Sequence, residues 1–265
     1  MESLINSKEK FYFILSLVIS IVLYLLMVVS IVGIIYLLIG IMISFIVHGL
    51  FIGNLRGNGI KISETQFPEV YHLSKEIANK MGMDAAPDIY IIQSNGMLNA
   101  FATKFLGRSF VVLYSDIFEL AYKQGEAELA FIICHEFAHL KRKHVSRRTI
   151  LLPSMVIPFL SQSYSRACEY TCDSFAAHYQ PNGAENGLLI LAVGKQLYQK
   201  VNIQEYINQR QKNSGFWVRL SELLSTHPDL PKRIQNIQRH IKGKMTLESN
   251  SVDSNTSSSA SSLSS

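Results

Sequence analysis

A stretch of 45 residues without a formal charge, Phe11 to Leu55, limits the folds open to this chain. As one helix rising 1.5 Å per residue it would extend about 68 Å, more than twice the hydrocarbon thickness of a bilayer. Two membrane-spanning helices fit this length, and Ser30 and Gly33 mark the expected turn between them. A wholly soluble or intrinsically disordered chain is excluded, and a cleaved signal peptide does not fit, because its apolar region is only about 7–15 residues long.

Positive charge flanks the apolar stretch at both ends. Lys8 and Lys10 precede it, and Arg56 and Lys61 follow it. Because basic residues near membrane spans stay in the cytoplasm, the pattern predicts an even number of spans with both ends cytoplasmic. The net charge of +5 has a further source in a basic cluster at 141–148, beside another apolar stretch. We therefore expect contact with anionic membrane lipid and no nucleic-acid partner.

The rest of the chain, without its C-terminal tail, contains about 190 residues, enough for one domain with a hydrophobic core. Hydrophobic periodicity, turn residues and β-branched runs predict the elements of this domain. The expected helices cover 68–81, 126–147, 163–179, 184–201, 216–224 and 231–241, and the expected strands cover 88–93 and 110–114. We therefore expect an α+β fold that is mainly helical, with a small sheet.

Three shorter segments complete the expected organisation. Asp116 and Glu119 resemble a capping box that opens a short helix ending at Gly125. Residues 149–160 are apolar but too short to span a bilayer, so they are expected to touch the membrane or the core. Serine makes up half of residues 246–265, which predicts a disordered tail.

The helix expected at 126–147 carries the pattern His-Glu-Phe-Ala-His at residues 135–139. Residues four apart share one face of a helix, so His135 and His139 can bind the same Zn²⁺ ion at about 2.0–2.1 Å. Glu136 is turned toward the same cleft and can reach the attacking water without binding the metal. Two histidines alone leave the site incomplete, because a catalytic zinc needs a third protein ligand and one open position.

The third ligand is expected on a later helix. The extended metzincin pattern would need glycine and histidine where this chain has Arg142 and Val145. A deformylase-like site would need a cysteine upstream of the motif, and none precedes Cys134. Glu169 can complete the ligand set, and Asp173, one turn further on the same face, can accept the second N–H of a ligand histidine.

Five sequence features, in a fixed order along the chain, together resemble the pattern of one protein family. They are the N-terminal hydrophobic hairpin, Asn99-Ala100-Phe101-Ala102, His135 to His139, Ser165-Arg166-Ala167-Cys168-Glu169 with Asp173, and Thr226-His227-Pro228. From about Phe11 to Ile241, the chain resembles the HtpX-type and CAAX-prenyl-protease-type family of membrane-anchored gluzincin metallopeptidases. The resemblance implies a zincin-like domain after a two-helix transmembrane hairpin. It also implies one Zn²⁺ per subunit on His135, His139 and Glu169, with Glu136 as catalytic base.

The same resemblance implies roles for residues outside the ligand helices. Asn99 and Ala100 would hold the substrate backbone at a strand edge, and His227 would steady the developing oxyanion. The alternative for residues 226–228 is a simple cap and turn. Many HtpX-type members have two further spans where this chain has only residues 149–160. The cysteines are expected to be buried apolar side chains rather than ligands: Cys134, Cys168 and Cys172.

The sequence therefore predicts a zinc metalloendopeptidase of the EC 3.4.24 class, in the cell membrane as a multi-pass protein with its catalytic domain in the cytoplasm. The expected segments are the cytoplasmic N-terminus at 1–10, the spans at 11–55, the metallopeptidase domain at 62–242 and the tail at 246–265. Membrane-proximal or misfolded proteins are the expected substrates, bound extended along a sheet edge. A catalytically silent, zinc-stabilised membrane scaffold is the alternative, against which the intact Glu136 argues. A prenyl-protein protease would need more hydrophobic segments.

Overall fold

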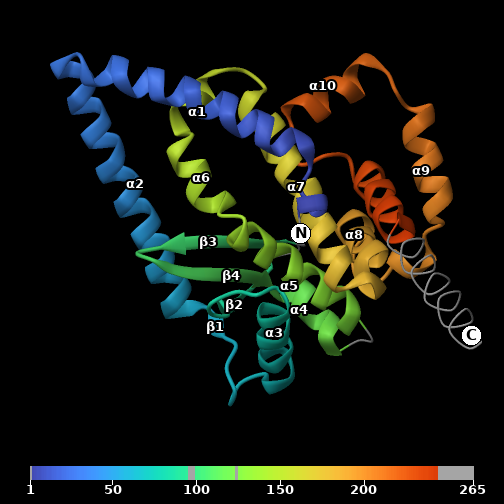
Figure 1. Cartoon of the computed structure of the whole chain (residues 1–265). Coiled ribbons are helices and arrows are strands. Elements are labelled where there is room, and N and C mark those ends of the chain that lie inside the picture. Colours follow the sequence, from blue (N-terminus) through green and yellow to red (C-terminus); the bar gives the residue numbers. More distant parts are fainter. Residues whose placement is uncertain (1, 95–98, 123–124, 244–265) are drawn as a thin grey trace, which may run out of the picture.

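Two long helices at the N-terminus form a V-shaped hairpin that projects from the rest of the molecule (Figure 1). The computed structural model describes residues 2–94, 99–122 and 125–243. Helices α1 (Ser7–Val28) and α2 (Ile31–Asn58) are both long and apolar enough to cross a bilayer. Most of their apolar side chains are exposed, as expected of lipid-facing helices. The number of spans and their orientation remain predictions.

The turn of the hairpin lies where the sequence predicts it. Ser30 caps α2, and its Oγ accepts a hydrogen bond of 2.9 Å from the backbone N–H of Gly33. A Cβ atom on Gly33 would lie 2.2 Å from the carbonyl oxygen of Met27, so only glycine fits this position. From the turn, α1 runs along α7 and α2 runs down to the sheet (Figure 1).

The sheet has four strands in the order β1-β2-β4-β3. They are β1 (Ile60–Lys61), β2 (Asp88–Ile92), β3 (Ala100–Phe105) and β4 (Arg108–Tyr114). β2 and β4 are parallel, and the other two pairs are antiparallel. Both strands predicted from composition are present as β2 and β4. β3 lies at one edge of the sheet and, within the described residues, pairs with β4 alone, so its outer side is open to a further strand.

The helices of the domain pack around α5, which lies against the sheet on one side and α7 on the other. The longer ones are α3 (Pro68–Lys80), α5 (Glu126–Lys141), α7 (Leu160–Tyr179), α8 (Ala184–Val193), α9 (Ile203–Lys212), α10 (Phe216–Leu224) and a last helix at 230–243. Phe131, Phe137 and Phe175 are fully buried where α5 and α7 meet the core. The mainly helical α+β prediction is confirmed, and α9 is an element that the periodicity did not indicate.

The prediction of one helix over 126–147 is wrong. α5 ends at Lys141, and Lys143 adopts a left-handed conformation with φ of 60°. A new helix, α6 (His144–Ile150), begins immediately after it. A single left-handed residue changes the chain direction, so His144 lies beside α5 instead of further along the same axis.

Two other local predictions are wrong as well. The helix expected over 184–201 ends at Val193, because Gly194 adopts φ of 83°. The capping box is not formed, since the short helix α4 (Ser115–Phe118) begins one residue before Asp116. The carboxylate of Asp116 instead accepts hydrogen bonds from Ser94 and Lys195.

The segment at 149–160 lies against α1 and exposes most of its apolar side chains. It includes the short helix η3 (Leu152–Val156), and the N–H of Ser154 donates to Ser20 Oγ on α1 at 3.3 Å. Leu152 and Val156 are among its exposed side chains. The apolar surface of the hairpin therefore continues onto this segment. The predicted Ser-rich tail lies outside the described residues.

Candidate metal centre and active site

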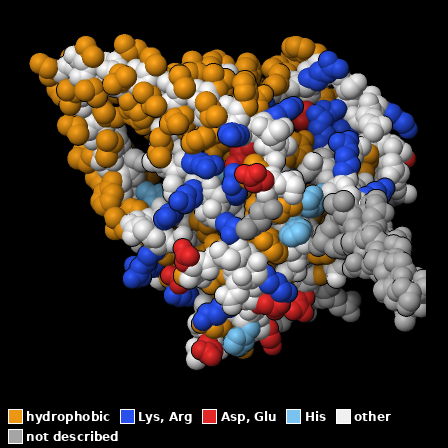
Figure 2. Space-filling view, viewed as in Figure 1, with side chains coloured by type: hydrophobic (Ala, Val, Ile, Leu, Met, Phe, Trp, Pro, Cys, Tyr) orange, Lys and Arg blue, Asp and Glu red, His pale blue; other side chains and the backbone are white. Residues whose placement is uncertain are grey.

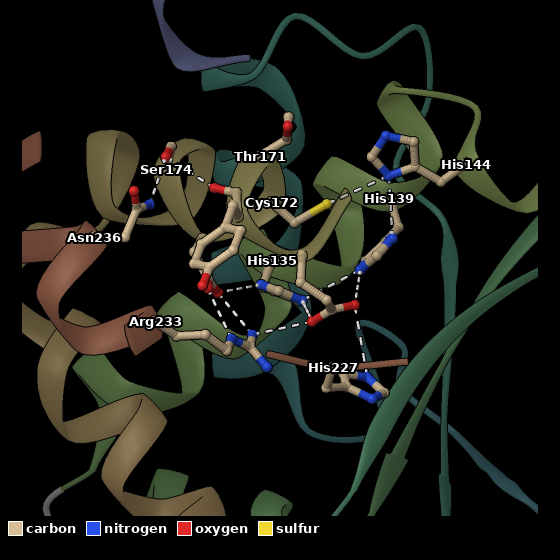
Figure 3. A network of polar contacts seen from close by, with 12 residues as sticks. His135, His139, His144, Thr171, Cys172, Ser174, His227, Arg233 and Asn236 are labelled. Carbon is tan, nitrogen blue, oxygen red and sulfur yellow. Dashed lines mark hydrogen bonds and ion pairs between the residues drawn. The ribbon is translucent and has the colours of Figure 1, made fainter. Parts of the chain in front are cut away.

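Three side chains from two helices direct their possible metal-binding atoms toward a common position (Figure 3). His135 and His139 on α5 bring their Nε2 atoms to 3.3 Å from each other. The carboxylate of Glu169 on α7 lies 3.4 Å from Nε2 of His135 and 3.3 Å from Nε2 of His139. Ligands at about 2.0–2.1 Å from a tetrahedral zinc lie about 3.3–3.4 Å apart. The three predicted ligands therefore fit one Zn²⁺ ion.

The second ring nitrogen of His135 faces a buried carboxylate. Its Nδ1 lies 3.0 Å from Asp173 Oδ1, so a proton on Nδ1 leaves Nε2 free to bind a metal. Arg233, on the last helix, donates to both oxygens of Asp173 at 2.7 and 2.8 Å. The same guanidinium lies 3.2 Å from Glu169. Asp173 thus lies where it can accept the Nδ1–H of His135, and Arg233 is a neighbouring residue that the sequence did not indicate.

The charges around the ligands favour a cation. Burial opposes a positive charge on His135, but the carboxylates of Asp173 and Glu169 outweigh it and raise the pKa of His135 to about 10. Burial by itself would raise the pKa values of Glu169 and Asp173, but the guanidinium of Arg233 and the neighbouring imidazoles hold both below their ordinary range. Both carboxylates therefore stay ionised, and a metal ion bound here would take the place of the proton.

His139 is oriented by a chain of contacts that reaches α1. Its Nδ1 lies 3.2 Å from Nδ1 of His144, whose Nε2 lies 3.1 Å from Glu9 on α1. Burial, the largest effect, lowers the pKa of His144 to about 4, so its neutral ring can accept a hydrogen bond from the Nδ1–H of His139. His144 is a buried residue outside the predicted site that touches a proposed ligand.

His144 also belongs to two other groups of possible donors, one with His139 and Cys172 and one with Glu9 and Cys168. The cysteines are free and buried, as predicted. Burial raises the pKa of the Cys172 thiol well above its ordinary range. The thiolate is the form that binds metals, so the group with two histidines and one carboxylate is the better match for Zn²⁺.

A cavity of about 240 Å³ opens onto the three donor atoms. Glu136 lines it from α5, and Asn99 and Ala100 line it from the start of the edge strand β3. His227 lines the same cavity, with its Nε2 3.6 Å from the carboxylate of Glu169. Its ring is 61% exposed in this open cavity (Figure 3). The fold thus brings all the predicted site residues together, with Asp173 behind His135 instead of in the cavity.

Comparison with known proteins identifies related chains. The model of Peptidase family M48 matches residues 64–157 and 151–241. A "Protease HtpX homolog" of Helicobacter pylori (strain Shi470) is 24% identical over 223 residues, which cover 68% of this chain and 69% of that protein. A homolog of Helicobacter acinonychis (strain Sheeba) is 23% identical over 219 residues, with the same coverage.

A solved structure shares the fold. The crystal structure of S. mikatae Ste24p superposes with a TM-score of 0.52 at 14% sequence identity. The match covers 77% of this chain but only 57% of that protein, so this chain spans little more than half the length of Ste24p. At this identity the likeness shows the fold and nothing about substrates.

Proposed function

Because this chain belongs to Peptidase family M48 and is a membrane metallopeptidase, we propose that it is a zinc-dependent endopeptidase of the EC 3.4.24 class. The observation that carries the proposal is the convergence of His135, His139 and Glu169 at 3.3–3.4 Å beside Glu136. Three ligands leave one coordination position for the reacting groups, whereas a structural zinc site is normally closed by four.

In the proposed reaction, a bound Zn²⁺ supplies a Lewis acid that acidifies water and polarises the scissile carbonyl. Glu136 takes the proton from the attacking water and passes it to the leaving amine. His227, which lines the same cavity, donates a hydrogen bond to the oxyanion as it forms. Asp173 and His144 hold the two ligand rings in orientation from behind.

The substrate is proposed to lie extended along β3. The backbone of β3 pairs with β4 on one side only, and the carbonyl of Asn99 is already bonded to the N–H of Tyr114. The free side of the strand can therefore add a peptide by main-chain hydrogen bonds, with Asn99 and Ala100 at the cavity. Because the cavity belongs to a domain attached to the apolar hairpin, we propose membrane-proximal or misfolded protein segments as substrates.

Loss of any metal ligand is expected to remove zinc. His135→Ala, His139→Ala and Glu169→Ala should each lose stoichiometric zinc, because two remaining ligands form a weak site. Metal analysis of the purified full-length variants measures this directly. In parallel, a chelator should stop cleavage of casein by the wild-type chain, and added zinc should restore it. A Glu169→Ala protein that still holds one zinc per chain would refute the third ligand.

His227→Ala is the control for the three ligand variants, because it alters the same cavity without removing a proposed metal ligand. It should keep zinc and its melting temperature while kcat falls by about 10²–10³, the usual cost of losing an oxyanion donor. Normal turnover, or a loss explained by unfolding, would leave His227 as a turn residue, held by its contacts with Thr226 and Ser225.

We also propose that the chain crosses the membrane twice, with both termini and the zinc domain in the cytoplasm. The support is the basic flanks of the hairpin. The test is Asn250→Cys on a background in which the three native cysteines are alanine. A membrane-impermeant thiol reagent should label this position only after intact cells are opened. Efficient labelling in intact cells would overturn the two-span arrangement.

A further inference from the structure

Helix α10 presents its apolar face outward. Phe216, Trp217, Leu223 and Leu224 are 69%, 77%, 44% and 57% exposed, and no residue of α10 is buried. These side chains fall within one arc of the helix, with the half-buried Leu220 at its centre. A helix on the surface of a soluble domain normally turns such a face toward the core. α10 does the reverse.

Polar contacts fix this orientation. Glu222, on the opposite face of α10, pairs with Lys232 at 2.5 Å and with Arg210 at 3.3 Å. Arg166 of α7 donates to the last carbonyl groups of the helix, at 2.9 Å for Glu222 and 2.9 Å for Leu223. Turning the apolar face of α10 inward would break these ion pairs and hydrogen bonds. The contacts therefore keep this face exposed.

The apolar face of α10 continues the surface of the transmembrane hairpin. Leu223 and Glu222 border a cavity of about 550 Å³ that they share with Lys8 and Tyr12 at the start of α1. α10 therefore lies at the level where the first span begins. Figure 2 shows hydrophobic side chains from the hairpin along the upper margin of the molecule toward α10.

Basic side chains border the same region. The cavity between α10 and α1 is lined by Lys8, Arg166, Lys232 and Arg239, with Glu222 as its acidic member. Arg219 is exposed at the side of α10. Lysine and arginine beside an apolar surface match anionic lipid headgroups, and tryptophan favours this interface because its ring is amphipathic.

We infer that α10 lies in the plane of the bilayer interface, with its apolar face about 5–10 Å deep at the boundary of headgroups and acyl chains. The occupant of this face is anionic membrane lipid. α10 is followed directly by Ser225, Thr226 and His227, and the last two line the metal cavity. Membrane contact at α10 therefore places the mouth of the cavity beside the lipid surface. The inference depends on the exposed face alone and stands whether or not the chain is catalytic.

The sole tryptophan of the chain, Trp217, reports on this helix directly. The full-length protein is reconstituted into vesicles of phosphatidylcholine and phosphatidylglycerol, and Trp217 fluorescence is recorded with two quenchers. Phosphatidylcholine brominated near the top of the acyl chain should quench the emission, and aqueous iodide should quench it weakly. Strong iodide quenching would overturn the inference. So would protection from both quenchers, which would show that protein covers α10.

Two relocated tryptophans calibrate the measurement on a Trp217→Phe background. Tyr36→Trp places the probe in the second turn of α2, where the native side chain is 68% exposed, and His72→Trp places it on the exposed side of α3. Trp217 should respond to brominated lipid more than the His72→Trp probe does. The double variant Phe216→Ser, Leu224→Ser keeps Trp217 and should lose that quenching, with an unchanged circular dichroism spectrum. A double variant that is quenched like the wild type would contradict insertion through this face.

Discussion

The Glu136→Gln protein should retain one zinc per chain, but its rate of peptide-bond hydrolysis should fall by a factor of about 10²–10⁴ or more relative to the wild type. Glutamine keeps the size of the side chain, but it cannot accept the proton of the attacking water. Glu136 lines the metal cavity, while the ligand atoms belong to its neighbours on α5 and α7. The variant should therefore separate proton transfer from metal binding. Casein cleavage by the zinc-loaded, full-length protein measures the rate.

Glu128→Gln is the matched control. Glu128 lies on the same helix and is equally buried, but its carboxylate accepts a hydrogen bond of 3.0 Å from Asn186, and it does not line the metal cavity. This variant should cleave casein at nearly the wild-type rate. If Glu136→Gln also cleaved at that rate, the chain would be a zinc-stabilised scaffold and the measured activity would come from a contaminating protease.

The sequence predicts those site residues whose relative positions follow from their spacing along a single helix. His135 and His139 share a helical face whatever the rest of the fold does, and the same reasoning places Glu169 and Asp173 together one turn apart. The hairpin was predictable for a similar reason, because the length of an apolar run follows from the thickness of a bilayer. In each case a local geometric rule links residues that are close in sequence.

The failure at 126–147 arises from backbone geometry that the residue type does not signal. Lys143 adopts φ of 60°, a conformation that is uncommon for a residue other than glycine. Hydrophobic periodicity therefore continued the helix through it, and the sequence did not place His144 at the site. In the structure His144 lies 3.2 Å from His139 because of that break. Tertiary packing holds the left-handed residue, and no propensity could predict it.

Glu9 and Arg233 were missed because their partners are distant in sequence. Glu9 belongs to the apolar helix α1, yet it pairs with Arg142 at 2.9 Å and with His144 at 3.1 Å. In the sequence, a charged residue at the start of an apolar helix indicates only that it flanks a membrane-spanning segment, and it does not indicate a buried partner. Only the packing of α1 against α7 brings it beside the histidine motif. The membrane anchor is therefore connected through charged and polar contacts to a proposed metal ligand.

Arg233→Met is expected to destabilise the protein by about 3–5 kcal/mol, the usual cost of removing one partner of a buried ion pair. Arg233 is 3% exposed and holds Asp173 by two hydrogen bonds. Without it, the buried carboxylates of Asp173 and Glu169 lose their main counter-charge. A domain of this size should melt about 10 °C lower. Thermal unfolding of the detergent-solubilised chain, followed by circular dichroism, measures the change.

Two further variants distinguish the loss of the buried ion pair from a packing defect as the cause of the lower stability. Arg239→Met changes the same residue type on the exposed side of the same helix, and its effect should stay within about 0.5 kcal/mol. Adding Asp173→Asn to Arg233→Met removes the unpaired charge and should recover part of the lost stability, because an isolated buried charge costs more than a missing pair. A double variant less stable than Arg233→Met alone would show that Arg233 acts through packing. In that case Asp173 would orient His135 without help from Arg233.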